Sequence, residues 1–287
     1  MTPVKRNIRL IAFDLDGTLL TSDKQLSEGN RTALFRAAEK GIEIVPVTGR
    51  VFDFVPDFVR TLPFLHYAIT LNGAEVLRLP GREIIRRAVI PCALALKIMR
   101  FLDDCPVIYD CYAGAESYMS AEMRARAAEY TDNVFFIRAL LSRRLPVENL
   151  SEFIREQHAD AKKILVYTKD YAYKQTLMGK LKDAFPMLSI TASDPDDIEI
   201  NIAEANKGTA LLALTKALGL SAEQSLAFGD GLNDISMLKA AGIGVAMGNA
   251  EKEVLAAADY VTENNDADGV AAGIYRFCFE EQPSDGF

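Results

Sequence analysis

Two carboxylates stand two residues apart in the segment Asp14-Leu15-Asp16-Gly17-Thr18, directly after the short apolar run Leu10–Phe13. The run has the large side chains of a buried strand, and in open parallel α/β sheets ligands bind just beyond the carboxyl ends of the strands. Asp14 and Asp16 would then face one crevice, where two ionised carboxylates repel unless one is protonated or a cation lies between them. Oxygen ligands favour a hard cation, Mg²⁺ above all where the bound group carries phosphate. A plain Asp-Gly turn is the alternative interpretation. An EF-hand loop is disfavoured, because Leu19 stands where that loop has its glycine.

Two further segments carry groups that can bind an anion. Thr48 and Gly49 follow the apolar run Ile42–Val47, and the Thr48 hydroxyl and the Gly49 amide can both donate to a phosphate oxygen. A helix cap is the alternative role for this threonine. Lys207 opens a predicted helix, where its charge and the free backbone N–H groups together favour an anion. Taken alone, a lysine in that position is more often a solvated surface charge.

A fourth segment, Gly229-Asp230-Gly231-Leu232-Asn233-Asp234, follows the predicted strand Ser225–Phe228 and adds two carboxylates and an amide. A loop that caps a helix accounts for Asn233 and Asp234, but it does not explain why so many acids converge. All four segments fall at the same edge of one inferred sheet. Their combination, more than any one of them, indicates a phosphate site that holds a metal ion.

The elements that must position these residues alternate between strand and helix. This pattern, seen in the first 80 residues and again from about residue 198, is typical of a parallel sheet covered on both faces. The predicted strands are 10–13, 42–47, 67–70, 198–202, 225–228, 243–247 and 260–261. The predicted helices are 27–40, a segment from 50 to about 60, 207–218, 233–240, 251–258 and a last one from about 268.

The middle of the chain departs from this alternation of strands and helices. Asn72-Gly73 and Pro80-Gly81 are turn signals that flank residues 74–79 and 83–90, and they predict a hairpin that leads out of the core. The polar cluster Ser193–Asp197 would lead back into it. We therefore expect residues 87–189 to form an inserted α/β cap domain, with residues 1–86 and 190–287 forming one discontinuous core domain.

Together these segments strongly resemble the motifs of the haloacid dehalogenase (HAD) superfamily of phosphotransferases. Within it the chain resembles the Cof-type phosphatases, which carry a large α/β cap between the second and third motifs, and the resemblance covers essentially the whole chain. Residues 14–18 match the nucleophile motif, Thr48-Gly49-Arg50 the second motif, Lys207-Gly208 the third and residues 229–234 the fourth. Leu71-Asn72-Gly73-Ala74 and residues 242–250 also resemble family segments. The resemblance implies an α/β fold with a Rossmann-like, doubly wound parallel sheet as its core.

The resemblance also implies a role for each motif residue. Asp14 would attack phosphorus and become an aspartyl phosphate, and Asp16 would protonate the leaving oxygen and then activate water. Mg²⁺ would be the cofactor, with a ligand set of Asp14, the backbone carbonyl of Asp16, Asp230 and, close by, Asp234. The phosphoryl oxygens would be bound by the backbone N–H of Leu15 and by Thr48, Gly49, Lys207 and Asn233. The implied enzyme is a phosphoric monoester hydrolase that acts on sugar phosphates or phosphorylated cofactors.

Composition excludes several classes of partner. The chain has 32 Lys+Arg against 40 Asp+Glu, a net charge of −8, which disfavours nucleic acid or an anionic membrane. Its four cysteines form no CxxC pair and it has only two histidines, so we do not expect a structural zinc site. Sparse cysteines of this kind predict a reducing, cytoplasmic location. No apolar stretch approaches the roughly 18 residues of a membrane span. The oligomeric state is not encoded in any motif.

Two other functions remain open from the sequence: a phosphosugar mutase of the same fold, and a non-catalytic protein that binds phosphorylated metabolites. The identity of the substrate is not encoded in a local motif either. Seven of the ten tyrosines lie in residues 87–189, and one hypothesis is that Tyr109 or Tyr112 lines the pocket for the leaving group. Ordinary core packing is the simpler role for any one of them.

Overall fold

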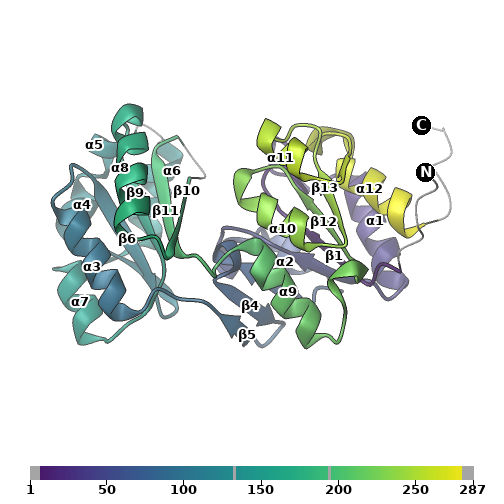
Figure 1. The fold of residues 1–287 in the computed structure, drawn as a ribbon, viewed down its shortest axis with the longest axis horizontal. Helices are drawn as coiled ribbons and strands as arrows, with labels where there is room; N and C mark the ends of the chain where they lie inside the picture. Colours follow the sequence, from purple (N-terminus) through teal and green to yellow (C-terminus); the bar gives the residue numbers. More distant parts are fainter. Residues whose placement is uncertain (1–6, 132–133, 193–194, 280–287) are drawn as a thin grey trace. The chain divides into compact units, whose positions relative to one another are not determined.

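The computed structural model describes residues 7–131, 134–192 and 195–279. The chain forms two compact units, one made of residues 1–87 and 206–287 and the other of residues 88–205 (Figure 1). Each is an α/β unit with its own sheet and its own hydrophobic core. The predicted α/β class is therefore present, and the first unit is made of two separate stretches of the chain.

The first unit is built on five parallel strands in the order β14-β13-β12-β1-β2. Their bounds are β1 Leu10–Phe13, β2 Glu43–Pro46, β12 Ser225–Gly229, β13 Ile243–Ala246 and β14 Tyr260–Val261. The helices of this unit are α1 Glu28–Glu39, α2 Asp57–Arg60, α9 Lys207–Ala217, α10 Ile235–Ala240, α11 Lys252–Ala257 and α12 Gly269–Cys278.

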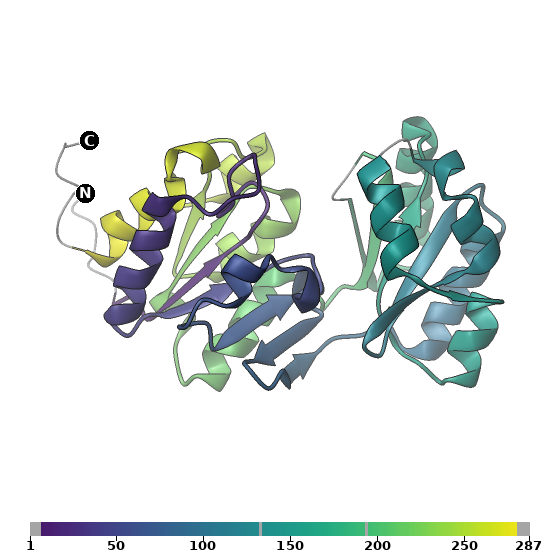
Figure 2. The same ribbon diagram turned by 180° about the vertical axis from the view of Figure 1, so that it is seen from behind.

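Alternate side chains of β1 point to opposite faces of this sheet, and both faces are covered. Ile11 and Phe13 pack in a core with apolar residues of α1 and α12. Leu10 and Ala12 pack in a second core with residues of α9, α10 and α11. The covering helices are seen on the two sides of the sheet in Figures 1 and 2. This doubly wound arrangement is why β1 reads as an uninterrupted apolar run.

Most predicted helices lie where the sequence placed them, but the segment after β2 does not form one long helix. It contains a 3₁₀ turn at Phe52–Phe54 and the four-residue α2, whose N-cap is Pro56. Proline lacks the N–H that an interior helix position must donate, so the helix begins after it. Ser27 caps α1 at its first turn, because its hydroxyl accepts the backbone N–H of Asn30.

The predicted hairpin is β4 Glu75–Arg78 and β5 Glu83–Arg87, which pair antiparallel. With β3 Tyr67–Thr70 they form a three-stranded antiparallel sheet. The sequence places β3 in the parallel sheet, but a single parallel bridge between Val47 and Ile69 is what joins it to the end of β2.

The second unit contains a six-stranded sheet in the order β10-β11-β9-β6-β7-β8. Its strands are β6 Ile108–Ala113, β7 Glu116–Ser120, β8 Leu145–Val147, β9 Ala161–Tyr167, β10 Leu188–Thr191 and β11 Asp197–Ile202. Its helices are α3 Cys92–Asp103, α4 Ala121–Ala125, α5 Ala127–Tyr130, α6 Val134–Arg143, α7 Leu150–Glu156 and α8 Tyr171–Ala184.

The second unit is longer than the sequence prediction. We expected the core domain to resume at residue 190, but β10 and β11 pair antiparallel with each other and β11 pairs with β9, so the second unit ends at Ala205. The period-two pattern of Ile198–Ile202 identifies a strand without indicating its partner. Of the expected return cluster, Ser193 and Asp194 lie outside the described residues.

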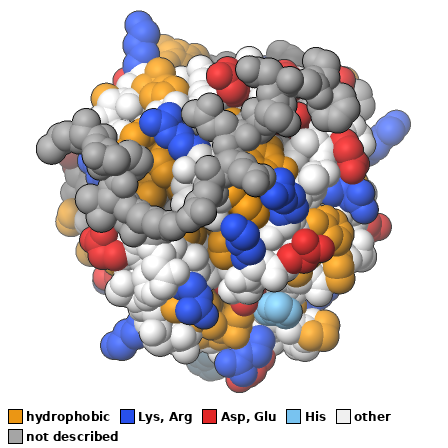
Figure 3. Space-filling model, turned by 90° about the vertical axis from the view of Figure 1, so that its right-hand side faces the viewer, with side chains coloured by type: hydrophobic (Ala, Val, Ile, Leu, Met, Phe, Trp, Pro, Cys, Tyr) orange, Lys and Arg blue, Asp and Glu red, His pale blue; other side chains and the backbone are white. Residues whose placement is uncertain are grey.

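One face of the molecule is drawn in Figure 3, where Lys and Arg side chains are mixed with acidic and apolar ones. In the part of the chain that the structure describes, every helix is too short or too polar to cross a membrane.

Candidate active site

Asp14 lies at the carboxyl end of β1, where its backbone N–H donates to the carbonyl of Phe228 in β12 at 3.1 Å. The residue is 8% exposed, and Asp14 Oδ1 accepts a hydrogen bond from Lys207 Nζ at 2.6 Å. The end of the strand therefore places this carboxylate in a buried site, next to the Lys207 ammonium group.

Lys207 is the first residue of α9 and is fully buried. Its ammonium group also donates to Asp234 Oδ1 at 2.6 Å. Asp234 Oδ2 in turn accepts the backbone N–H groups of Asp230 and Gly231, each at 3.0 Å. Asp234 thus holds both the lysine and the loop that carries Asp230.

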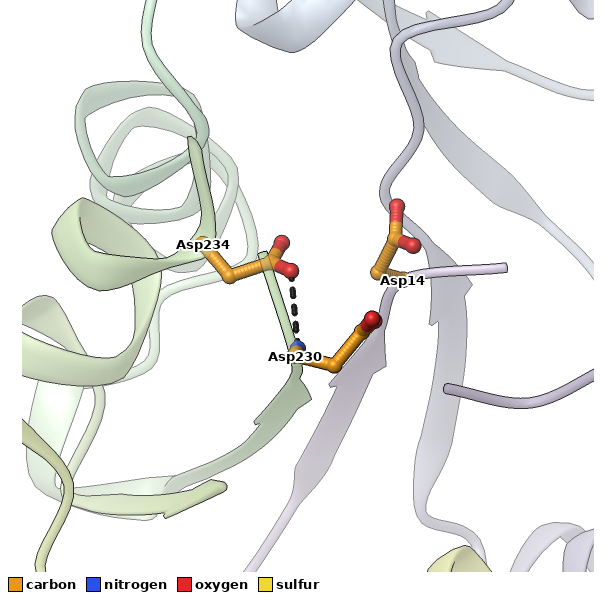
Figure 4. A group of neighbouring side chains, drawn as sticks. All are labelled: Asp14, Asp230 and Asp234. Carbon is orange, nitrogen blue, oxygen red and sulfur yellow. Dashed lines mark hydrogen bonds between the residues drawn. The ribbon is translucent and has the colours of Figure 1, made fainter. Parts of the chain in front are cut away.

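Asp230 follows β12, and its Oδ1 accepts the hydroxyl of Thr18 at 2.6 Å. Gly17 is needed beside it: its φ is +83°, and a Cβ there would lie 2.3 Å from Asp230 Oδ2. Only glycine allows this backbone conformation and this close approach together. Figure 4 shows the carboxylates of Asp14, Asp230 and Asp234 converging from the ends of their elements.

These three acids form a group whose ligand oxygens lie within 4.8 Å of one another. Burial raises the pKa of Asp14 to about 7, helped by the charges of Asp234 and Asp230 and opposed by Lys207. Burial also raises the pKa of Asp230 to about 6. Burial alone would lower the pKa of Lys207, but Asp14 and Asp234 together raise it. Three carboxylates against one ammonium leave a surplus of negative charge, and an oxygen-only donor set of this kind fits a hard divalent cation.

The Asp16 carboxylate is engaged elsewhere. Arg50 Nε donates to Asp16 Oδ2 at 2.8 Å and Arg50 Nη2 to Oδ1 at 2.6 Å, while Lys24 Nζ lies 2.9 Å from Oδ1. Burial tends to raise the pKa of Asp16, but hydrogen bonds and charge from Arg50 and Lys24 lower it below its ordinary value. The sequence places Arg50 in the second motif but predicted no role for it, and Lys24 was not predicted to belong to the site.

Thr48 and Gly49 lie beyond the end of β2, next to a residue that the sequence interpretation left without a role. The backbone N–H of Asn72 donates to the Thr48 carbonyl at 3.0 Å. Asn72 Oδ1 accepts from Asn233 Nδ2 at 3.1 Å and would be 2.9 Å from a Cβ on Gly49. The Asn-Gly pair was read as a turn signal; the left-handed backbone at Leu71 and Asn72 is what bends the chain back toward Thr48.

The structure therefore brings most of the predicted site residues to one edge of the sheet. Asp14, Lys207, Asp230 and Asp234 form one bonded cluster, and Thr48, Gly49 and Asn233 are connected through Asn72. The Leu15 side chain is fully buried in the core beneath them. Thr18, which bonds Asp230, was not assigned a role from the sequence.

Residues 11–274 match the family described as haloacid dehalogenase-like hydrolase. The chain belongs to the haloacid dehalogenase-like hydrolases. The predicted membership, with the Cof-type arrangement, is confirmed, and so is the enzyme class, because similar proteins of known name are phosphatases.

Two of these relatives show the extent of the similarity. The 5-amino-6-(5-phospho-D-ribitylamino)uracil phosphatase YcsE of Bacillus subtilis (strain 168) is 31% identical over 272 residues, 93% of this chain and 95% of that protein. The pyridoxal phosphate phosphatase YbhA of Escherichia coli (strain K12) is 33% identical over 271 residues, 93% of this chain and 97% of that protein.

Solved structures agree with this HAD-like fold. A HAD-like hydrolase from B. subtilis has a TM-score of 0.78 and 31% identity, covering 93% of this chain and 99% of that one. BT1666 from Bacteroides thetaiotaomicron, studied among HAD phosphatases, has a TM-score of 0.79 and 28% identity, covering 97% and 98%.

In the second unit of this HAD-like hydrolase, Tyr109 is not available to line a pocket. It is 2% exposed in the apolar core, and its hydroxyl donates to Asp103 Oδ1 at 2.5 Å. Tyr112 is also buried, with the Arg144 guanidinium 5.1 Å and the Lys163 ammonium 5.6 Å from its ring centre. Both tyrosines have packing roles in this structure, as the simpler hypothesis predicts.

Proposed function

We propose that this chain is a Mg²⁺-dependent phosphatase that hydrolyses small phosphomonoesters through an aspartyl phosphate on Asp14. The observation that carries the proposal is the buried cluster of Asp14, Asp230 and Asp234 around a single lysine. Such a surplus of buried carboxylate is costly in a merely structural site, because each unbalanced charge is taken out of water. A divalent cation supplies the missing partner, and it also allows an anionic phosphate group to approach these carboxylates.

The residues of the chain divide the work as follows. Asp14 is the nucleophile: one carboxylate oxygen attacks phosphorus, the bond from phosphorus to the ester oxygen breaks, and Asp16 gives its proton to the departing oxygen. Lys207 is held at the Asp14 carboxylate and supplies positive charge to the equatorial phosphoryl oxygens, since phosphoryl transfer depends mainly on alignment and charge neutralisation. Mg²⁺, held by Asp14, the Asp16 carbonyl and Asp230 with Asp234 close by, would screen the repulsion between the nucleophile and the phosphate.

The remaining predicted phosphate ligands belong to the same proposal. The backbone N–H of Leu15, the Thr48 hydroxyl, the Gly49 amide and the Asn233 side chain would donate to the phosphoryl oxygens. Asn72 supports this set, because it bonds Asn233 and packs against Gly49. The cytoplasmic location predicted from the sparse cysteines stays a prediction.

Turnover of para-nitrophenyl phosphate by the purified chain tests the activity. We expect hydrolysis with Mg²⁺, little in excess EDTA, and restoration when Mg²⁺ is added back. An unchanged rate in EDTA, or no turnover under any metal condition, would reject the proposal.

A panel of phosphomonoesters then defines the substrate class. The names of YcsE and YbhA point to small phosphorylated metabolites, so the panel should contain 5-amino-6-(5-phospho-D-ribitylamino)uracil and pyridoxal phosphate beside sugar phosphates. The same assay on a hexose phosphate separates hydrolysis from the mutase alternative, since a phosphatase releases inorganic phosphate and a mutase forms an isomer.

A further inference from the structure

The guanidinium of Arg50 is fixed on three sides. Two of its nitrogens bond the two carboxylate oxygens of Asp16, at 2.8 and 2.6 Å, and Nη1 donates to the carbonyl of Phe54 at 2.9 Å. Its backbone is fixed as well: the N–H donates to Thr48 Oγ1 at 3.2 Å and the carbonyl accepts from Leu71 at 3.0 Å. A paired contact of this kind sets the orientation of a carboxylate, which a single flexible cation does not.

Among the described residues, the contacts of Asp16 leave one direction of its carboxylate open for a proton. Arg50 and Lys24 together place three donors on its carboxylate, and an ionised carboxylate has about four acceptor directions. The remaining direction lies on Oδ2, to judge from the bonds made by the described residues. A carboxylate held in this way can accept a proton from water in that direction while every one of these contacts is kept, and it can later give up the proton from the same direction.

We propose that Arg50 is a positioning residue that holds Asp16 as the proton acceptor for hydrolysis of the aspartyl phosphate. The inference rests on the proposed function and deepens it. In this step a water oxygen attacks phosphorus, the bond from phosphorus to the Asp14 oxygen breaks, and its electron pair returns to the Asp14 carboxylate. Asp16 takes one proton of the water, and inorganic phosphate leaves. That proton is the one Asp16 gives to the next ester oxygen, so the cycle balances.

Lys24 provides a matched control, because it contacts the same Asp16 oxygen in a different way. It makes a single ion pair, and its side chain is 57% exposed against 32% for Arg50. Exposed single ion pairs contribute little. If orientation is what counts, Arg50 and Lys24 must differ strongly in effect although both are cations on one carboxylate.

The experiment compares Arg50→Met, Arg50→Lys and Lys24→Gln with the natural chain, using para-nitrophenyl phosphate and Mg²⁺. Nitrophenolate departs without a proton, so kcat/KM reports attack by Asp14, and kcat reports hydrolysis of the aspartyl phosphate once that step is slow. Rapid mixing measures the burst of nitrophenolate before steady state. Circular dichroism and a melting curve show that each variant is folded.

In Arg50→Met we expect kcat and KM to fall together by about 10- to 100-fold, the scale of a weakened general base. We expect kcat/KM to stay within about threefold and the burst to approach one nitrophenolate per enzyme, as the intermediate accumulates. Arg50→Lys should lie between Arg50→Met and the natural chain, and Lys24→Gln within about twofold of the natural chain. In an Asp16→Asn background, Arg50→Met should have almost no further effect on kcat, because its target is gone.

A fall of kcat/KM as large as that of kcat would overturn the inference, since Arg50 would then bind the phosphate or support the site generally. An unchanged kcat in folded Arg50→Met would overturn it too, as would equal effects of the Arg50 and Lys24 variants. These outcomes leave the proposed function intact. The proposed function itself fails on a separate result, namely turnover that persists in Asp14→Asn or is absent from the natural chain.

Discussion

Each unit buries a group of charged side chains, and the two groups differ in balance. In the first unit Lys207 bonds Asp14 and Asp234, with Asp230 beside them. In the second, Arg144 bonds Asp110 at 2.7 Å and Lys163 bonds Glu199 at 2.5 Å. Burial is similar in both, but each cation of the second group bonds one carboxylate, whereas Lys207 bonds two and has a third beside them.

The pKa values follow this difference. In the first unit the pKa values of Asp14 and Asp230 are raised by burial and by neighbouring carboxylates, so the site gives up protons reluctantly. In the second, burial would lower the pKa of Lys163 and of Arg144, but their carboxylate partners raise both, so the pairs stay charged. Both clusters are buried, so burial does not distinguish them. The uncompensated negative charge of the first cluster is what identifies it as a candidate ligand-binding site.

The strongest test of this comparison is Asp14→Asn. We expect kcat on para-nitrophenyl phosphate to fall at least about 10³-fold, because the nucleophile is removed. We expect the free energy of unfolding in EDTA to stay equal or rise, since the change relieves surplus negative charge. Steady-state kinetics and urea unfolding on one preparation check both. A large loss of stability would contradict the interpretation that this cluster carries surplus negative charge.

The counterpart in the second unit is Lys163→Met, which takes the cation from Glu199. We expect the free energy of unfolding to fall by about 3–5 kcal/mol, as for other buried ion pairs that lose one partner. Lys163→Met combined with Glu199→Met should recover most of it. Urea unfolding measures the change. Full stability of Lys163→Met, or loss of turnover in the folded variant, would contradict the structural role that we assign to this second group.

The first group should make the stability of the metal-free chain depend on pH between about 4 and 7. An unfolded aspartate titrates near pH 4, whereas Asp14 and Asp230 titrate at about 7 and about 6 when folded. Between these values the folded chain binds more protons, so the free energy of unfolding falls as pH rises from about 4 to 7. In EDTA we expect the melting temperature to drop by roughly 5 °C over this range.

Saturating Mg²⁺ should offset that drop at neutral pH, because the metal binds the ionised carboxylates of the folded chain. Asp14→Asn should flatten the pH profile. Melting curves at pH 5, 6 and 7.5, with EDTA and with Mg²⁺, separate these effects. A profile that rises from pH 5 to 7.5 in EDTA would contradict the assigned pKa directions.

The smallest effects should come from two glycines with positive φ. Gly17 has φ +83° and lies against Asp230, whereas Gly114, in the second unit, has φ +57° and open space around it. Both alanine variants should lose about 1–2 kcal/mol of stability from the left-handed backbone. Gly17→Ala should also lower kcat/KM about 10-fold or more by displacing Asp230, and Gly114→Ala should leave it unchanged. Equal kinetics in the two variants would show that the Gly17 contact is unimportant.

Local patterns predicted the elements of the core well. A buried run ends in Asp14, a serine caps α1, and Lys207 begins α9. The partner of β11 was not predicted, because alternation along Ile198–Ile202 specifies a half-buried strand and says nothing about which sheet pairs with it. The contacts of Asp16 with Arg50 and Lys24 were missed for a similar reason, since residues brought together by turns leave no periodic signal.

By itself, the sequence determined the family and the motif residues, since their types and order reflect the chemistry and do not depend on exact packing. The tertiary structure alone decided which carboxylates share a lysine, which one is held by an arginine, and how far each pKa moves from its ordinary value. These properties depend on burial and on distances of a few ångströms between segments far apart in the chain, as between Asp14 and Lys207. Electrostatic interactions change steeply with distance and solvent exposure, and a linear pattern of residues specifies neither.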